Sequence, residues 1–207
     1  MALTVQILEA GLRRWAQGLD DAAPELNRLD AQLGDGDLGA TLSKCAASVR
    51  AALDAGPHAD LGQAFKACAM GCARASGSSF GTLLTVAFMT LARTLEGRPE
   101  VEWRELPALM DACLDAMSSR GGAKLGDKTV LDALAAARAA VDGVDAPAAQ
   151  QAAALRAVEA ALAEFRGRPN KIGRARMFSE RSVGLDDPGM VAFRHMVASL
   201  APTAEQA

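Results

Sequence analysis

Apolar residues recur at three- and four-residue spacing along most of the chain, the pattern of amphipathic α-helices. Alanine is abundant and tyrosine is absent, while the β-branched and aromatic residues that strands favour are scarce. Pro147 suits the first turn of a helix, where a missing amide costs no hydrogen bond. The pattern predicts eight helices, at residues 3–19, 41–53, 61–75, 80–95, 103–117, 128–141, 147–165 and 189–200.

The segments between these helices are short and contain Gly, Pro or Asp, as at 54–57, 96–99 and 142–145. Short links favour antiparallel packing of neighbouring helices. No stretch has the composition of an interdomain linker, so we expect one all-α domain over residues 1–207. The exception is 166–188, which is long, polar and without a helical period. A segment of that kind inside a compact domain is usually functional.

Composition excludes several classes of function. The formal net charge is −3, which gives no support for a nucleic-acid or anionic-membrane surface. No apolar run approaches the roughly 20 residues of a membrane span. Residues 1–6 lack the basic and apolar regions of a signal peptide. We therefore expect a cytoplasmic protein.

The four cysteines, Cys45, Cys68, Cys72 and Cys113, lie in apolar contexts. Cys68 and Cys72 are four residues apart and can share a helix face, but neither histidine is near them in sequence. We interpret them as reduced core residues of a cytosolic protein and not as a metal site.

Residues 29–39 hold three aspartates, Asp30, Asp35 and Asp37, among three glycines. Glycines permit a tight wrap, and three carboxylates at one place repel one another unless a cation is bound. Magnesium, a hard cation that prefers oxygen ligands, fits such a site. A calcium loop and a simple Asp/Gly turn are the alternatives. An EF-hand starting at Asp35 would need Glu at its twelfth position, where Ala46 stands.

Two further segments are glycine-rich. Residues 74–82 end one helix and start the next, so their amides form either an anion site or a plain helix cap. Residues 121–129 look like a phosphate loop, but Asp127 separates Gly126 from Lys128, and no strand precedes them. The α/β mononucleotide fold is therefore not indicated.

The polar stretch 171–176 offers cations. An arginine there either neutralises charge on a transferring phosphoryl group or lies in a solvated loop. His58 and His195 are interpreted as structural, since no nucleophilic triad is apparent.

Taken together, four segments resemble the L subunit of dihydroxyacetone kinase, the DAK2 or DhaL family, in that family's order and spacing: 29–39, 75–82, 121–129 and 173–189. The resemblance spans nearly the whole chain, and the length suits a free-standing L subunit. It implies an antiparallel barrel of eight helices with a nucleotide site at one end.

The resemblance also implies ligands, partners and site residues. Asp30, Asp35 and Asp37 would hold two Mg²⁺ ions that bridge the phosphates of ADP or ATP, and Arg174 would be catalytic. The ketose would be held by a separate K subunit. The phosphoryl donor would be ATP or a phosphotransferase-system protein, and the assembly a homodimer. The implied nucleotide-binding residues are Leu38, Gly39, Ala40, Thr41, Ala75, Ser76, Gly77, Gly121, Val130, Arg174, Asp187, Pro188 and Gly189.

Two residues depart from the family pattern: Leu38 replaces a usual histidine and Thr41 a usual asparagine. Loss of a donor to the phosphates would weaken nucleotide binding by about 1–3 kcal/mol. A divergent ketose kinase is thus one expectation. A non-catalytic, nucleotide-loaded module that docks onto a regulator is the alternative.

Overall fold

The computed structural model describes residues 2–75 and 77–201, which form eight α-helices. Each predicted helix corresponds to one of them, so the all-α prediction is confirmed. In chain order they are α1 (Val5–Leu33), α2 (Leu38–Asp54), α3 (Leu61–Ala75), α4 (Ser79–Thr94), α5 (Leu106–Gly121), α6 (Val130–Val141), α7 (Pro147–Arg166) and α8 (Pro188–Ala198).

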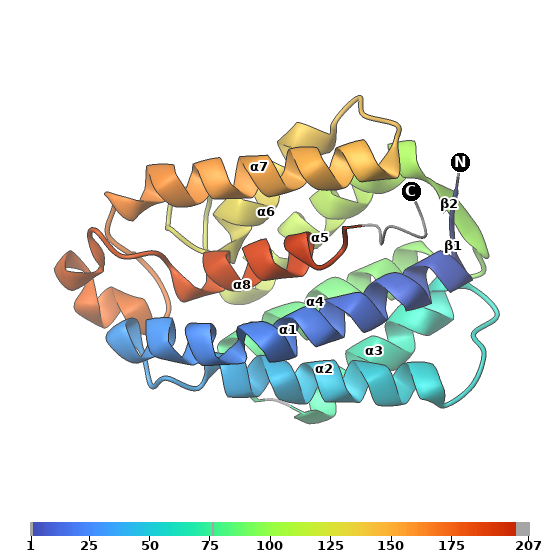
Figure 1. Ribbon diagram of the computed structural model, residues 1–207, viewed down its shortest axis with the longest axis horizontal. Coiled ribbons are helices and arrows are strands. Elements are labelled where there is room, and N and C mark those ends of the chain that lie inside the picture. The colour runs from blue at the N-terminus through green and yellow to red at the C-terminus, as the bar shows by residue number, and fades with distance from the viewer. Residues whose placement is uncertain (1, 76, 202–207) are drawn as a thin grey trace.

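The helices form a closed antiparallel ring. Each helix packs against the next one in the chain, and α8 packs against α1 (Figure 1). Short connections reverse the chain direction at each step. The predicted antiparallel eight-helix barrel is confirmed. One consequence matters for the site: α2, α4, α6 and α8 all begin at the same end of the barrel.

Two three-residue strands, β1 (Ala2–Thr4) and β2 (Glu100–Glu102), pair antiparallel, with Leu3 opposite Val101. They lie at the end of the barrel away from the start of α8 (Figure 1). The sequence did not indicate them, because three residues are too few to show an alternating pattern. Trp103–Glu105 then forms a 3₁₀ turn, η1, so α5 begins three residues after its predicted start.

Helix α1 ends fourteen residues later than predicted, at Leu33 and not at Leu19. Its first turn is capped by Thr4, whose hydroxyl accepts from the amide of Ile7 at 3.4 Å. The helix continues through Pro24. Proline inside a helix costs about 3 kcal/mol, but Leu26 and Leu33 beyond it are 0% and 2% exposed. Burial of these side chains offsets that cost.

The main core runs along the barrel and is built from leucine, valine, alanine and cysteine. Within it, the ring of Phe88 contacts Trp15 edge-on and Phe65 in a tilted arrangement, with ring centroids 5.7 Å and 6.0 Å apart. A second, smaller apolar cluster lies between α5 and α6 and includes Met117, Val130 and their neighbours. This second cluster lines one wall of the candidate site.

The polar stretch after α7 folds into two 3₁₀ turns, η2 (Arg174–Phe178) and η3 (Glu180–Ser182). Arg166 at the end of α7 pairs with Asp186 at 2.8 Å, and its carbonyl accepts from the amide of Gly184 at 2.8 Å. The stretch lies at the end of the barrel where α1 finishes and α8 begins (Figure 1). It thereby contributes to the candidate site.

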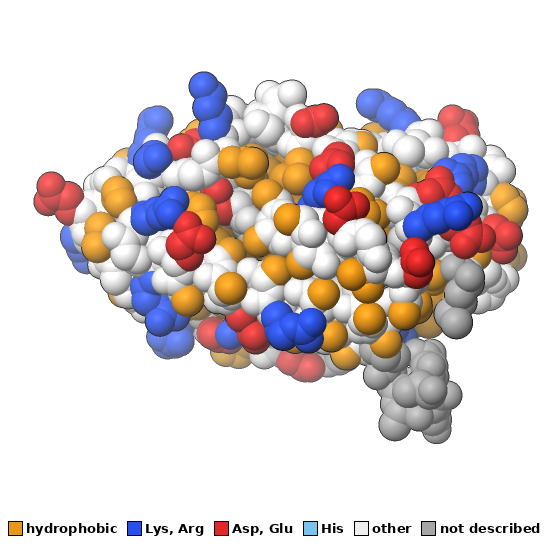
Figure 2. Space-filling model, turned by 90° about the horizontal axis from the view of Figure 1, so that it is seen from above, with side chains coloured by type: hydrophobic (Ala, Val, Ile, Leu, Met, Phe, Trp, Pro, Cys, Tyr) orange, Lys and Arg blue, Asp and Glu red, His pale blue; other side chains and the backbone are white. Residues whose placement is uncertain are grey.

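Within the described part of the chain, no helix combines the length and apolar character that crossing a membrane requires. Figure 2 shows the face that carries α7, where acidic and basic side chains are interspersed and no broad basic patch forms. That face lacks the electrostatic footprint of a nucleic-acid-binding surface.

Candidate functional site

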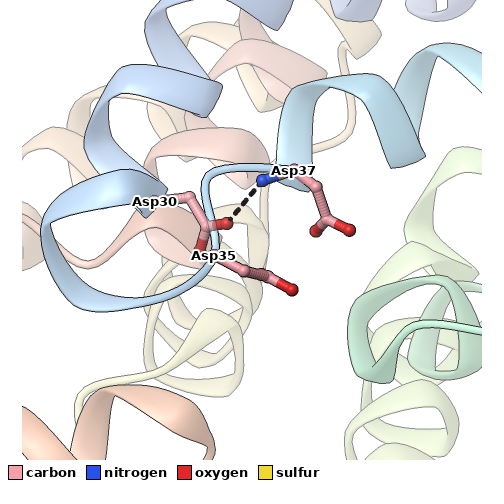
Figure 3. Close-up of side chains that lie close together, drawn as sticks. All are labelled: Asp30, Asp35 and Asp37. Carbon is pink, nitrogen blue, oxygen red and sulfur yellow. Dashed lines mark hydrogen bonds between the residues drawn. The ribbon is translucent and has the colours of Figure 1, made fainter.

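Three carboxylates gather where α1 gives way to α2. Asp30 lies in the last turn of α1, while Asp35 and Asp37 lie in the connection that follows. Each offers an oxygen, and these oxygens all lie within 4.8 Å of one another. Gly36, with φ of 77°, supplies the left-handed turn that folds the connection back. Figure 3 shows the three side chains around this turn.

The sequence placed Asp30 in a loop, and this was wrong: Asp30 is helical, because α1 extends to Leu33. Its carboxylate fixes the connection by accepting from the amide of Asp37 at 3.0 Å (Figure 3). It also accepts from the amide of Leu38 at 3.3 Å. Asp35 and Asp37 are exposed. One aspartate therefore anchors the turn while the other two present oxygens outward.

A cation already faces this cluster. The guanidinium of Arg174, from η2, forms an ion pair with Asp35. Its charge offsets the repulsion among the carboxylates. Clustered carboxylate oxygens suit a hard divalent cation such as Mg²⁺. The residues present therefore fit a magnesium site.

A cavity of about 520 Å³ opens beside the carboxylates. The first residues of four helices line it, namely Leu38 of α2, Ser79 of α4, Val130 of α6 and Pro188 of α8. Helix N-termini carry partial positive charge and favour anions. The antiparallel ring thus directs four positive helix ends towards one cavity, next to a cation site.

Side chains cap three of these helices. Ser78 accepts from the amide of Gly81 at 3.0 Å, and Thr129 accepts from the amide of Leu131 at 3.2 Å. Asp187 accepts from the amide of Met190 at 2.8 Å. The caps fix where each helix begins, so they position the amides that face the cavity.

Asp187 is the buried acid of this site. Burial raises its pKa to about 6, although hydrogen bonds from the Met190 amide and the Asn170 side chain oppose the shift, as does the charge of Lys128. Asn170 donates to Asp187 at 2.8 Å. The carboxylate is therefore held in a fixed position at the start of α8.

Most of the predicted site residues meet at this cavity. Its lining includes the three aspartates and Leu38, Gly77, Gly121, Val130, Arg174, Asp187, Pro188 and Gly189. Ser76 lies outside the described residues. The structure therefore brings four segments that are distant in sequence to one cavity.

Four predicted residues do not line the cavity: Gly39, Ala40, Thr41 and Ala75. Gly39 is a packing residue, because a Cβ there would lie 2.1 Å from the carbonyl oxygen of Ala23. The amide of Ala40 donates to the Asn27 side chain at 3.1 Å. Thr41 is buried, and its amide donates to the carbonyl of Asp37 at 2.9 Å.

Sequence reasoning missed the apolar wall of the cavity and one cation. The wall is formed by Phe80, Leu83, Met117 and Ile172, and Arg120 stands at the end of α5. Phe80 and Leu83 lie three residues apart, so they share a helix face. That spacing was a usable signal, but nothing local marks Met117 or Ile172 as their partners.

The residues interpreted as structural lie away from the cavity. The four cysteines are free and buried, as predicted, and burial raises the pKa of Cys68 to about 12 and that of Cys113 to about 11. His58 and His195 contact Glu9 and Glu25, at 2.8 Å and 2.7 Å. Neither histidine lines the cavity.

Comparison with known proteins agrees with this geometry. The family model described as the DAK2 domain matches residues 32–202. The chain is 40% identical to a D-erythrulose kinase of Mycolicibacterium smegmatis over 185 residues, covering 84% of this chain and 31% of that protein. It is 29% identical to the ADP-binding subunit DhaL of the PEP-dependent dihydroxyacetone kinase of Escherichia coli, covering 87% and 88% of the two chains.

Among solved structures, the dihydroxyacetone kinase of C. freundii in complex with AMP-PNP and Mg²⁺ has a similar fold, with a TM-score of 0.75 at 24% identity. The match covers 97% of this chain and 34% of that one. The chain thus spans about a third of the length of both larger kinases, 31% and 34%.

Proposed function

The chain belongs to the DAK2 domain family, and from this premise we propose that it is the nucleotide-binding L subunit of a kinase for dihydroxyacetone or a related short ketose. The observation that carries the proposal is the pairing of two features at one end of the barrel. A carboxylate cluster suited to Mg²⁺ adjoins a cavity at which four helix N-termini converge.

Asp30, Asp35 and Asp37 would hold two Mg²⁺ ions, and the phosphates of ADP or ATP would lie between them and the helix ends. Bound magnesium would neutralise phosphate charge and orient the transferring group. The apolar wall of Phe80, Leu83 and the second cluster suits the face of a purine ring. The cavity therefore offers the three features that a nucleotide requires: a cation site, an anion site and an apolar wall.

Catalysis by these residues would consist of positioning and charge neutralisation. Arg174 is the proposed catalytic residue, because its guanidinium is beside the carboxylates and on the wall of the cavity. Neither histidine lines the cavity to serve as a base. We therefore assign the ketose to a K subunit that docks at this end.

The 40% identity to a D-erythrulose kinase supports a ketose of three or four carbons. For the phosphoryl donor, ATP and a phosphotransferase-system protein that recharges bound ADP are both compatible with the cavity. We also propose that the protein is a homodimer and that it is cytoplasmic, as expected from the sequence.

Calorimetry with Mg²⁺ and ADP tests the nucleotide site. Asp35→Asn removes the negative charge of one carboxylate of the proposed metal site. We expect it to abolish magnesium-dependent ADP binding and to leave the helical circular dichroism unchanged. Asp115→Asn, an exposed aspartate of α5 outside the cavity, is the matched control. Unchanged ADP affinity in Asp35→Asn would show that residues 29–39 are a structural turn.

Turnover is tested by mixing the protein with its K partner, Mg²⁺ and either ATP or the phosphorylated donor protein. Dihydroxyacetone and both erythrulose enantiomers are the substrates to compare. The expected result is a phosphorylated ketose with one of the two donors. Tight ADP binding without turnover on any short ketose would instead favour the docking module.

A further inference from the structure

We infer that Lys128 is a positioning residue whose buried ammonium closes segment 166–187 into the wall of the nucleotide cavity. This inference rests on the proposed function and extends it. Lys128 belongs to the glycine-rich stretch that resembles a phosphate loop, in which a lysine would contact the nucleotide. The structure assigns it a different task.

The ammonium of Lys128 is surrounded by backbone carbonyls. Its Nζ donates to Arg168, Ser182 and Leu185, at 2.8 Å each, and lies 3.4 Å from the carbonyl of Arg166. The residue is 0% exposed. An ammonium has three N–H donors, so the three short bonds use all of them. A neutral amine has only two, and the carbonyls therefore require the charged form.

These carbonyls come from both ends of segment 166–187. Arg166 and Arg168 stand where α7 ends, while Ser182 and Leu185 stand just before α8. One ammonium thus joins the N-terminal and C-terminal ends of the segment. Arg174 lies between the two joined ends, and its position over Asp35 depends on their closure.

Asn170 extends the same network to α8. Its side-chain amide donates to the carbonyl of Lys128 and to the carboxylate of Asp187, at 2.8 Å in both cases. Its backbone amide donates to the hydroxyl of Ser182 at 2.8 Å. Asp187 caps α8, so the backbone of Lys128 is linked to the first turn of that helix at the cavity.

The arrangement has an energetic cost at Lys128, in its backbone and in its charge. Among the described residues other than glycine, Lys128 alone has a positive φ, of 62°. Burial lowers the pKa of its ammonium, a shift that the charges of Asp187 and Asp186 oppose. A strained backbone and a buried charge persist only where the surrounding contacts compensate. Lys128 does not line the cavity, so it acts on the nucleotide through segment 166–187.

Two substitutions separate this task from general stability. Lys128→Met keeps a long side chain but removes the charge. Lys128→Gly suits the positive φ and leaves room for an added amine. Lys171→Met is the matched control, since Lys171 lies in the same segment and is exposed. Its ammonium donates to the carbonyl of Gly126 at 2.9 Å and lies 4.0 Å from the carboxylate of Asp127.

We expect both Lys128 variants to retain the helical circular dichroism of the wild type. They should bind Mg²⁺-ADP about 10- to 100-fold more weakly, because a misplaced Arg174 would lose its charged hydrogen bond to the phosphates. Trypsin should cut them faster within 166–187 than it cuts the wild type, which has the same lysines and arginines in that segment. In Lys128→Gly, n-butylammonium, which matches the missing side chain, should restore both ADP affinity and trypsin resistance. Its neutral analogue n-butanol should not.

Wild-type ADP affinity in Lys128→Met overturns the inference. So does weak ADP binding with unchanged trypsin resistance, because that result would indicate direct contact with the nucleotide. If Lys128→Gly unfolds, the comparison of Lys128→Met with Lys171→Met still decides.

Failure of the wild type to bind Mg²⁺-ADP would refute the proposed function instead. The trypsin and amine-rescue measurements would then still test the ammonium's role in closing the segment, because neither needs a nucleotide.

Discussion

Arg174 and the proposed metal ion would compete for the same carboxylate. The guanidinium pairs with Asp35, whose oxygens are also offered to the candidate metal site. Replacement of Arg174 by alanine removes the competitor but also removes a cation from the nucleotide cavity. The substitution should therefore change metal affinity and nucleotide affinity in opposite directions.

The two effects differ in size. The Arg174 and Asp35 side chains are 62% and 46% exposed, and exposed ion pairs contribute about 0.2–1 kcal/mol. Metal affinity in the absence of nucleotide should then rise only about 1.4- to 5-fold. A hydrogen bond from a charged group to phosphate contributes about 1.5–3 kcal/mol. Loss of that bond should weaken Mg²⁺-ADP binding by roughly 10- to 150-fold.

The assay is calorimetric titration with Mn²⁺ alone and then with ADP at saturating Mg²⁺. Arg176→Ala is the control, because Arg176 is an exposed residue of the same 3₁₀ turn and does not line the cavity. Weaker Mn²⁺ binding in Arg174→Ala would refute the reasoning, since it would mean that the guanidinium supports the metal site. Unchanged ADP affinity would remove Arg174 from the proposed catalytic role.

Two further predictions concern stability. The folded protein keeps the proton of Asp187 up to a pKa of about 6, whereas its ordinary value is 3.8. Stability should accordingly fall by up to about 3 kcal/mol as pH rises from 4 to 6, and urea titrations of Asp187→Asn should lack this contribution. Gly39→Ala should cost about 1–3 kcal/mol in thermal unfolding, because its Cβ would overlap the Ala23 carbonyl. Gly167→Ala, with open space around the added carbon, should leave the melting temperature unchanged.

The helices were predictable because their signal is local. Spacing of apolar residues and a few caps identify eight segments, and short connections set their antiparallel order. The end of α1 was missed for the same reason. Pro24 is a local stop signal, and the burial of Leu26 and Leu33 beyond it, which appears only in the folded chain, offsets its cost.

The candidate site was predictable where it is carried by polar motifs and not where it is carried by packing. The aspartates, Arg174 and the start of α8 stand out as sequence patterns, and the fold brings them to one cavity. Lys128 was read as part of a glycine-rich motif, yet its carbonyl partners lie 38 to 57 residues away. Such a contact is fixed only when the ring closes.

Leu38 and Thr41, the two residues that depart from the family pattern, differ in the same respect: one lines the cavity and the other is buried outside it. Leu38 lines the cavity, so the absence of a polar side chain there bears directly on the ligand. Thr41 is buried outside it and bears on packing. The two positions look alike in sequence because both follow the aspartates closely.

The closed ring also constrains how such a domain can grow. Antiparallel neighbours all the way round require an even number of helices, since an odd number would leave two parallel helices side by side. A single inserted helix would therefore reverse every later element and turn the start of α8 away from the carboxylates. Extra helices that preserve the site must therefore enter in pairs, as a helical hairpin. The connections opposite the cavity, between α2 and α3, α4 and α5, or α6 and α7, are where a hairpin leaves all four helix N-termini in place.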